Sequence, residues 1–256
     1  MTLPPDIGLT TDIYEDLSLG AALERIATFA DLAEVYSSGP HSLLLADNRG
    51  EAQACGLRLT VHGPYESLHP GSPDGTARRA AVDTHRRHLE AAAEVGASLY
   101  VVHPDYVEEP RPRDERVVAA LTRTIADLGE LQRELGVRIV LENMPGHGCS
   151  HFVAPGDLDL GELGFLLDTG HAAICESLDD FLTDAHLPLA HVHLHDNRGP
   201  ADADDPHRPL GRGVVDAGAV LTVARYAGAT VILELMSEDD VIESVGYLVE
   251  KGLVPA

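Results

Sequence analysis

Acidic and histidine side chains recur in this chain at the ends of short apolar, β-branched segments. The segments read LTVHGPY, YVVHPD, IVLENMPG, FLLDTGHA, HVHLHDN and VILELM, and the residues at their ends are His62, His103, Glu142, Asp168, His193 and Glu234. Imidazole and carboxylate groups together suit Zn²⁺, Mn²⁺ or Fe²⁺. If one fold brings these ends together, they form a divalent metal centre.

Two further groups extend the candidate ligand set. In DTGHA, Asp168-x-x-His171 lets one segment leaving a strand present a carboxylate and an imidazole to neighbouring metals. In DDPHRPLGRG, Asp205 and His207 lie in a loop that follows the seventh apolar segment. Taken alone, a strand-end histidine is an ordinary loop residue and a carboxylate is an ordinary helix cap. A converging ring of carboxylates, however, would destabilise a low-dielectric interior without cations.

The stretch HVHLHDN places three histidines at alternate positions. In a strand, alternate side chains point the same way, so His191, His193 and His195 share one face while Val192 and Leu194 face a core. Three histidines on one face of a strand need hydrogen-bond partners. If Glu34, on the second predicted strand, also points into the barrel, it too needs a partner. We expect a bound water or an arginine to satisfy Glu34, and we place it outside the site.

Apolar segments alternate with amphipathic ones along the whole chain, which is the pattern of repeated βα units. The predicted strands are Ile7–Leu9, Ala33–Tyr36, Leu57–His62, Leu99–His103, Val137–Glu142, Gly164–Asp168, Ala190–His195 and Val231–Leu235. The predicted helices are Leu19–Phe29, Arg49–Ala54, Thr76–Val95, Arg113–Leu135, a poorly defined piece near Pro155–Leu160, Leu178–Asp184, Ala217–Tyr226 and Asp239–Lys251.

Eight βα units without a break in composition predict an α/β fold in which residues 1–256 form one domain, a single (β/α)8 TIM barrel. Gly96, Gly136 and Gly228 each stand where a helix would end before the next strand. The alternative is an open doubly wound sheet, which normally carries a glycine-rich turn after its first strand, and GLTTD is not one. In a parallel barrel, the strand ends meet at the C-terminal face, where active sites form.

The net charge of −24 limits the partners of this protein. It disfavours nucleic acid and anionic membrane, because phosphate backbones bind clustered lysine and arginine. Lys251 is the only lysine, so Schiff-base chemistry is not expected. The chain has no long apolar run or leader, and its three cysteines lack CxxC spacing, so we expect a cytoplasmic protein without disulfides. The acidity is also typical of a salt-adapted or high-GC organism. Self-association is left open.

The ordered series VHGPY, VVHPD, VLENMPG, LLDTGHA, VHLHDN, DPHRPLGRG and LELM resembles the xylose-isomerase-like TIM barrels over nearly the whole chain. That superfamily includes endonuclease IV, sugar isomerases and epimerases, and a cobamide-remodelling phosphodiesterase branch. The endonuclease IV branch typically binds three zinc ions. The resemblance implies a first metal at His62, His103 and Glu142, a second at Glu142, Asp168, His193 and Glu234, and a third at His171, Asp205 and His207.

Two reactions fit this set. A multinuclear centre bridged by Glu142 would hydrolyse a phosphate ester or phosphodiester of a small sugar-phosphate-containing molecule, and this is the reading that the sequence favours. The alternative is a mononuclear sugar or sugar-phosphate isomerase or epimerase, in which Glu142 and Glu234 exchange a proton with the substrate. An apurinic-site endonuclease is disfavoured by charge, and a non-catalytic metal scaffold by the number of ligands. Zinc is the expected cation, with manganese or iron as alternatives.

Three further residues are candidates for the site. His195, where the nuclease motif has asparagine, is either a catalytic proton carrier or substrate contact, or a hydrogen-bonded loop residue. Arg208 and Arg212 lie beside the loop of Asp205 and His207, where they could hold a substrate phosphate. The other interpretation of these arginines is that both are solvated.

Overall fold

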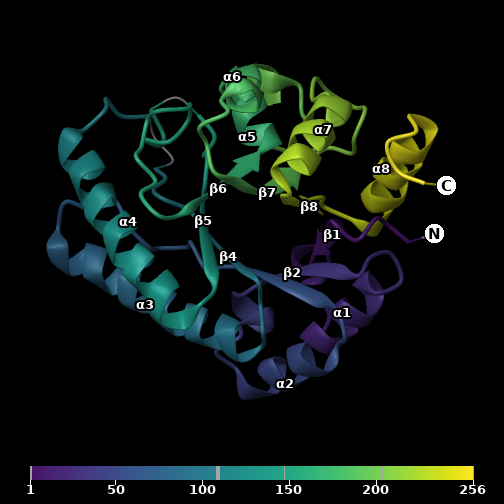
Figure 1. Cartoon of the computed structure of the whole chain (residues 1–256), viewed down its shortest axis with the longest axis horizontal. Coiled ribbons are helices and arrows are strands. Elements are labelled where there is room, and N and C mark those ends of the chain that lie inside the picture. The colour runs from purple at the N-terminus through teal and green to yellow at the C-terminus, as the bar shows by residue number, and fades with distance from the viewer. Residues whose placement is uncertain (1, 108–109, 147, 203, 256) are drawn as a thin grey trace.

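The computed structural model describes residues 2–107, 110–146, 148–202 and 204–255. Within them, the strands close into a parallel barrel in the order β1-β2-β3-β4-β5-β6-β7-β8, and β8 pairs with β1. The predicted TIM barrel is therefore confirmed (Figure 1). The strands are β1 Ile7–Thr10, β2 Leu32–Tyr36, β3 Arg58–His62, β4 Leu99–Val102, β5 Arg138–Glu142, β6 Gly164–Asp168, β7 Leu189–Leu194 and β8 Thr230–Leu233.

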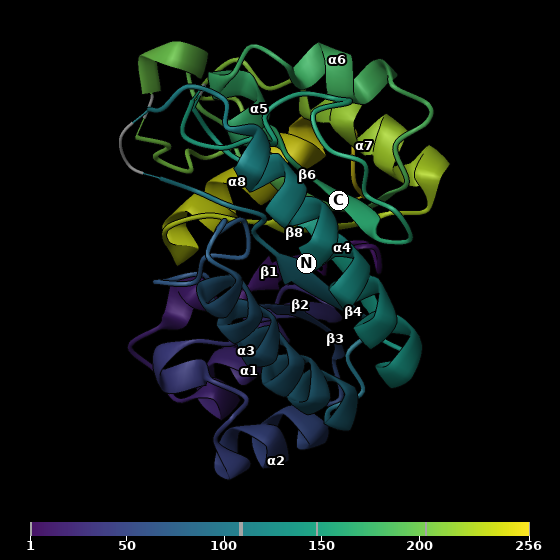
Figure 2. The same ribbon diagram turned by 90° about the vertical axis from the view of Figure 1, so that its left-hand side faces the viewer.

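Helices surround the barrel, and Figure 2 shows α3 and α4 side by side on one flank. The α-helices are α1 Leu19–Ile26, α2 Ala46–Ala54, α3 Gly75–Glu94, α4 Glu115–Leu135, α5 Thr169–Ile174, α6 Leu178–Thr183, α7 Ala217–Ala227 and α8 Glu238–Glu250. Short 3-10 turns cover Thr11–Tyr14, Gly39–His41 and Gly199–Asp202.

Local rules account for most of these boundaries. Gly136 and Gly228 end α4 and α7 with φ values of 71° and 68°, and Gly96 follows α3 with φ of 74°. This left-handed conformation suits glycine, so the predicted helix ends are confirmed.

Three expectations about elements need correction. Pro155–Leu160 forms turns rather than a helix, because Asp157 accepts hydrogen bonds from the Val153 and Ala154 backbone N–H groups, at 3.0 and 2.8 Å, in a local loop. Helix α5 directly after β6 was not predicted, whereas α6 agrees with the predicted helix Leu178–Asp184. His103, His195 and Glu234, which we expected inside strands, lie just beyond the ends of β4, β7 and β8.

The two faces of β7 differ in polarity. Val192 and Leu194 are fully buried among apolar side chains of the core, as the alternation predicts. His191 and His193 are also fully buried, on the opposite face of the strand, which points toward the barrel axis. In the part of the chain that the structure describes, no helix is both long and apolar enough to cross a membrane.

Helix α3 buries two histidines that are not near the end of any strand. His85 Nδ1 lies 3.1 Å from the Tyr100 hydroxyl, and His88 Nδ1 lies 3.0 Å from Ser37 Oγ. Burial lowers the pKa of His85 to about 3 and that of His88 to about 4. Both imidazoles are therefore neutral in the folded protein at neutral pH, whereas the unfolded chain takes up protons near pH 6.5.

We predict that these histidines make the fold sensitive to acid. A folded pKa below the unfolded value gives stability that is present above about pH 6.5 and is lost as the pH falls toward 4 and then 3. In His88→Gln, the free energy of unfolding, measured by urea titration between pH 4 and 6.5, should fall less steeply, by up to about 1.4 kcal/mol per pH unit. The exposed His186→Gln should keep the wild-type slope. Equal slopes in all three proteins would contradict this origin.

Candidate metal centre

A cavity of about 830 Å³ opens where the βα loops leave the C-terminal ends of the strands. Most of the candidate ligands meet at its floor or wall. Those that line it are His62, His103, Glu142, His171, His207 and Glu234. Their strands lie on different sides of the barrel, so barrel closure is what brings them together.

The first group gathers on Glu142, which ends β5 and is 1% exposed. His103 Nε2 lies 3.0 Å and His62 Nε2 lies 3.5 Å from Glu142 Oε2. The two imidazole rings meet edge to face, with centroids 4.9 Å apart. The predicted first ligand set is thus assembled in space.

The second group gathers on Nδ1 of His193. Glu234 Oε2 lies 3.0 Å from this nitrogen, and Glu142 Oε1 and Asp168 Oδ2 each lie 3.8 Å from it. Glu142 therefore contacts both groups through its two different oxygens. This position fits the bridging role that the resemblance implies.

The third group gathers on Asp205, whose Oδ2 lies 3.2 Å from both His171 Nε2 and His207 Nε2. Asp205 and His207 have φ values of 45° and 44°, in the left-handed region that residues other than glycine seldom adopt. Such conformations cost about 1–3 kcal/mol each and cluster at functional sites. Asn197 helps to hold the loop, because its amide donates to Asp205 Oδ1 at 3.1 Å.

The donor atoms themselves indicate that a cation is expected. Five buried polar atoms of the described residues have no hydrogen-bond partner. Arg49 Nε lies away from the cavity, and the other four lie at the site: Glu142 Oε2, His193 Nδ1, His195 Nδ1 and Asp205 Oδ2. A buried polar atom without a partner costs about 1–3 kcal/mol. Three of the four belong to the predicted ligands, and nitrogen and carboxylate oxygen are suitable donors for zinc. The residues present therefore fit one or more divalent metals.

Without metal, the site balances its carboxylates with protonated imidazoles. Burial opposes the charge of His171, but Asp168, Asp205 and Glu142 outweigh it and raise its pKa to about 10. The pKa of His207 rises to about 9, because Asp205 and Glu234 outweigh burial in the same way. Metal binding must displace these protons, so we expect affinity to fall as the pH is lowered.

His195 lies beside the ligands rather than at the cavity wall. Its Nε2 lies 3.2 Å from both oxygens of Asp168, and its ring stacks on that of His207, with centroids 4.0 Å apart. A Cβ at Gly170 would come within 2.0 Å of His195 Cε1, so only glycine allows this approach. Contact with a substrate is not supported by this position, whereas a hydrogen bond to a metal ligand is.

The two arginines that we expected to bind substrate are engaged elsewhere. Arg208 donates to both oxygens of Asp202, at 2.6 and 3.0 Å. Arg212 is exposed and pairs with Glu243. Neither is among the described residues that line the cavity. Asp202, six residues before Arg208, and Glu243 on α8 determine where these two side chains point.

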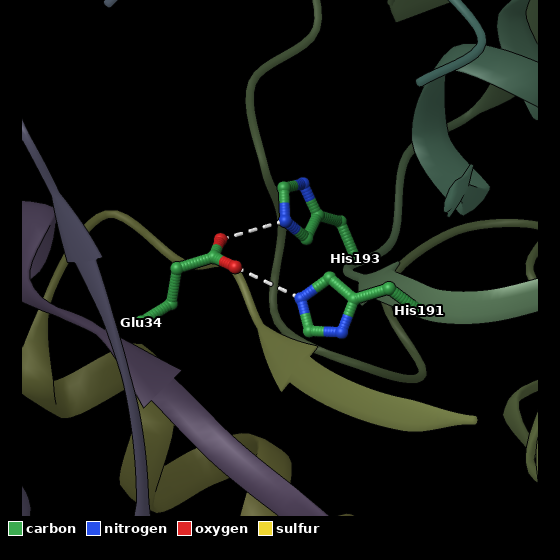
Figure 3. A group of neighbouring side chains, drawn as sticks. All are labelled: Glu34, His191 and His193. Atoms are coloured by element: carbon green, nitrogen blue, oxygen red, sulfur yellow. Dashed lines mark hydrogen bonds and ion pairs between the residues drawn. The ribbon is translucent and has the colours of Figure 1, made fainter. Parts of the chain in front are cut away.

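The structure also brings Glu34 next to the candidate ligands, although the sequence analysis placed it outside the site. Its carboxylate contacts His191 Nε2 and His193 Nε2, at 2.9 and 2.8 Å (Figure 3). The expected water or arginine partner was therefore wrong, because two histidines of β7 occupy both oxygens. The signal available in the sequence was an acid within the apolar run LAEVY together with the alternating histidines of HVH.

Comparison with known proteins agrees with this geometry. The chain matches the xylose isomerase-like TIM barrel family over residues 34–251, and it belongs to that family. It is 30% identical to an uncharacterised protein of Methanocaldococcus jannaschii, over 91% of this chain and 92% of the relative.

Two other similarities bear on activity. A probable endonuclease 4 of Mycobacterium leprae is 29% identical over 87% of this chain and 91% of that protein. The solved structure of a D-tagatose 3-epimerase-like protein superposes with a TM-score of 0.80 and 26% identity, covering 95% of this chain and 96% of the other. The chain is thus similar both to a probable endonuclease and to an epimerase-like protein.

We predict that Glu142 is the ligand on which metal content depends most. Glu142→Gln keeps the volume but removes the charge that faces His62, His103 and His193, so metal affinity should fall by at least about 10- to 100-fold and turnover should be lost. Elemental analysis after equilibration with zinc measures the first effect. Glu66→Gln, an acid of the same cavity that pairs with Tyr36, is the matched control. Full loading with normal activity in Glu142→Gln would rule out the bridging role.

Proposed function

We propose that residues 1–256 form one catalytic domain that isomerises or epimerises a sugar or a sugar phosphate with a divalent metal. The observation that supports this most directly is the convergence of Glu142, Asp168 and Glu234 on Nδ1 of His193. Three carboxylates and one imidazole are a sufficient ligand set for one cation. The similarity to the D-tagatose 3-epimerase-like structure favours the same reaction class.

The proposed chemistry is proton transfer next to a carbonyl. A divalent cation in this site would polarise the carbonyl and stabilise the negative charge that forms on its oxygen. Glu142 ends β5 and Glu234 follows the end of β8, so they can approach a bound sugar from different sides. Burial opposes their ionisation, but the facing histidines outweigh it and lower the pKa of both carboxyls. Both are therefore ionised and able to accept a proton from carbon.

The cavity also has a suitable size and wall for a small sugar. Its volume of about 830 Å³ is in the range of ordinary small-molecule sites. Tyr65, 44% exposed, stacks on His103 with ring centroids 4.5 Å apart, and its ring also lies against Tyr36. An exposed aromatic face at the wall offers an apolar surface for the C–H groups of a sugar ring.

Phosphate-ester hydrolysis is the second candidate, and it is the one that the sequence favoured. The group of His171, Asp205 and His207 supports it, because a single-metal isomerase does not need these residues. The endonuclease 4 relative fits hydrolysis as well, although a net charge of −24 disfavours nucleic acid. The epimerase-like structure matches nearly the whole chain, and we therefore place isomerisation first.

The two reactions can be separated by an assay panel. Zinc-, manganese- and iron-loaded protein is incubated with ketoses, ketose phosphates, generic phosphodiesters and an abasic-site duplex. We expect sugar interconversion, lost in Glu234→Gln but retained within about tenfold in Asp205→Ala and His207→Ala, because proton transfer needs only one metal. Ester cleavage that disappears in the last two variants, without interconversion, would establish hydrolysis instead. Cleavage of the abasic duplex would identify a repair nuclease.

Arg111 is the residue best placed to recognise a phosphorylated sugar. It is the only arginine among the described residues that line the cavity, and within the described part of the chain it forms no ion pair. Its backbone N–H donates to Gly148 O at 2.7 Å, which ties the loop after β4 to the loop after β5. A guanidinium at the cavity wall can bind a phosphate with two parallel hydrogen bonds.

We predict that Arg111→Gln discriminates between free and phosphorylated sugars. Loss of a hydrogen bond to a charged group costs about 1.5–3 kcal/mol, so KM for the sugar phosphate should rise about 10- to 100-fold. KM for the free sugar should stay unchanged. The control is Arg113→Gln, because Arg113 already pairs with Glu115 and Asp157. An equal change for both substrates would mean that Arg111 does not bind the phosphate.

A further inference from the structure

We propose that Glu34 is a positioning residue that fixes the tautomer and the ring orientation of the metal ligand His193. The argument uses the ligand role of His193 but does not depend on which reaction the centre performs. Glu34 lies in the middle of β2, and His193 lies near the end of β7. Figure 3 shows the carboxylate facing the rings of His191 and His193, with one oxygen directed at each.

The hydrogen bonds around Glu34 determine where the protons are. Oε2 accepts from the Thr60 hydroxyl at 2.9 Å and faces His191 Nε2 at 2.9 Å, while Oε1 faces His193 Nε2 at 2.8 Å. An ionised carboxylate can only accept hydrogen bonds. Both imidazoles must therefore carry a proton on Nε2.

The other nitrogens of the two rings then differ in what they can do. His191 Nδ1 lies 2.6 Å from Thr230 Oγ1 and can accept from that hydroxyl, so all polar atoms of this ring are satisfied by protein. His193 Nδ1 has no hydrogen-bond partner and lies 3.0 Å from Glu234 Oε2, among the other ligands. With a cation bound, a proton held on Nε2 by Glu34 would leave the lone pair of His193 on Nδ1, the nitrogen that faces the other candidate ligands.

Burial makes this arrangement hard to replace. Glu34 is 1% exposed, and His191 and His193 are 0% exposed, so bulk water does not reach them. Hydrogen bonds to a charged group are stronger in such surroundings, and an outer carboxylate also increases the donor strength of a metal-bound imidazole. Loss of such a partner typically lowers metal affinity by about 10- to 100-fold.

Glu34→Gln tests the assignment at nearly constant volume. The amide offers one accepting oxygen and one donating nitrogen, so only one of the two imidazoles can still donate from Nε2. If the other is His193, its proton moves to Nδ1 and the lone pair no longer faces the ligands. We expect zinc affinity, measured by competition with a chromophoric chelator, to fall about 10- to 100-fold. Glu34→Asp keeps the charge and should recover part of this loss.

Thr60→Val is the matched control, because it removes a buried hydrogen bond to the same carboxylate without touching His193. It should lower the free energy of unfolding of the chelator-treated protein, measured in urea, yet leave zinc affinity close to wild type. Imidazole ¹⁵N–¹H spectra of the zinc-loaded protein give a readout that a merely structural role would not change. They should show a protected Nε2–H on His193 in wild type and in Thr60→Val, and its loss in Glu34→Gln.

The outcomes separate this assignment from the metal centre itself. Wild-type affinity in a folded Glu34→Gln would overturn the positioning role alone. Equal losses of affinity in Glu34→Gln and Thr60→Val, in proportion to their losses of stability, would reduce Glu34 to a structural residue. If Glu34→Gln does not fold, the same comparison is made with Glu34→Asp. Failure of the wild-type protein to bind zinc, manganese or iron would overturn the metal centre and this assignment together.

Discussion

The constraint on which this structure depends is the burial of several carboxylates within a few ångströms of one another. Glu142 and Asp168 are almost fully buried, and Asp205 and Glu234 lie close to the same histidines. Like charges at this separation cannot all ionise in a low-dielectric interior without positive charge between them. Imidazolium groups supply that charge in the metal-free protein, and the unpartnered donor atoms are arranged for a cation to supply it instead.

The barrel holds these groups in place because each one stands at or next to a strand end. Asp205 and His207 are the exception, because they lie in the loop that follows β7. Several hydrogen bonds to one carboxylate hold this loop in place. Asp196, at the start of the loop, accepts hydrogen bonds from the Gly211, Gly213 and Val215 backbone N–H groups. These bonds offset the cost of two left-handed backbone positions in the same loop. The third ligand group is thus held in position before any cation binds.

Beneath the candidate ligands, part of the barrel interior is a polar network, beside a small buried apolar cluster that includes Val101, Val140 and Leu166. The network consists of hydrogen bonds among Glu34, Thr60, His191 and Thr230. Glu34 also contacts Nε2 of His193, which leaves Nδ1 facing the other candidate ligands. A buried polar network stabilises the fold only when every polar group in it has a hydrogen-bond partner. The candidate ligands lie above this network, and residues of these types suit proton transfer at one metal or hydrolysis at several.

The sequence by itself determined the eightfold alternation of strands and helices and most of the ligand set, because periodicity, helix-ending glycines and strand-end polar residues are local features. His62, Glu142 and Asp168 could be placed at one face from the rule that parallel strand ends converge. Only the tertiary structure decided the rest. Glu34 and His191 are 157 residues apart, and their contact follows from barrel closure alone. Arg208 and Arg212 lie beside the ligand loop in the chain, yet Asp202 and Glu243 turn them away from the cavity, because a salt bridge depends on which side chains meet in space.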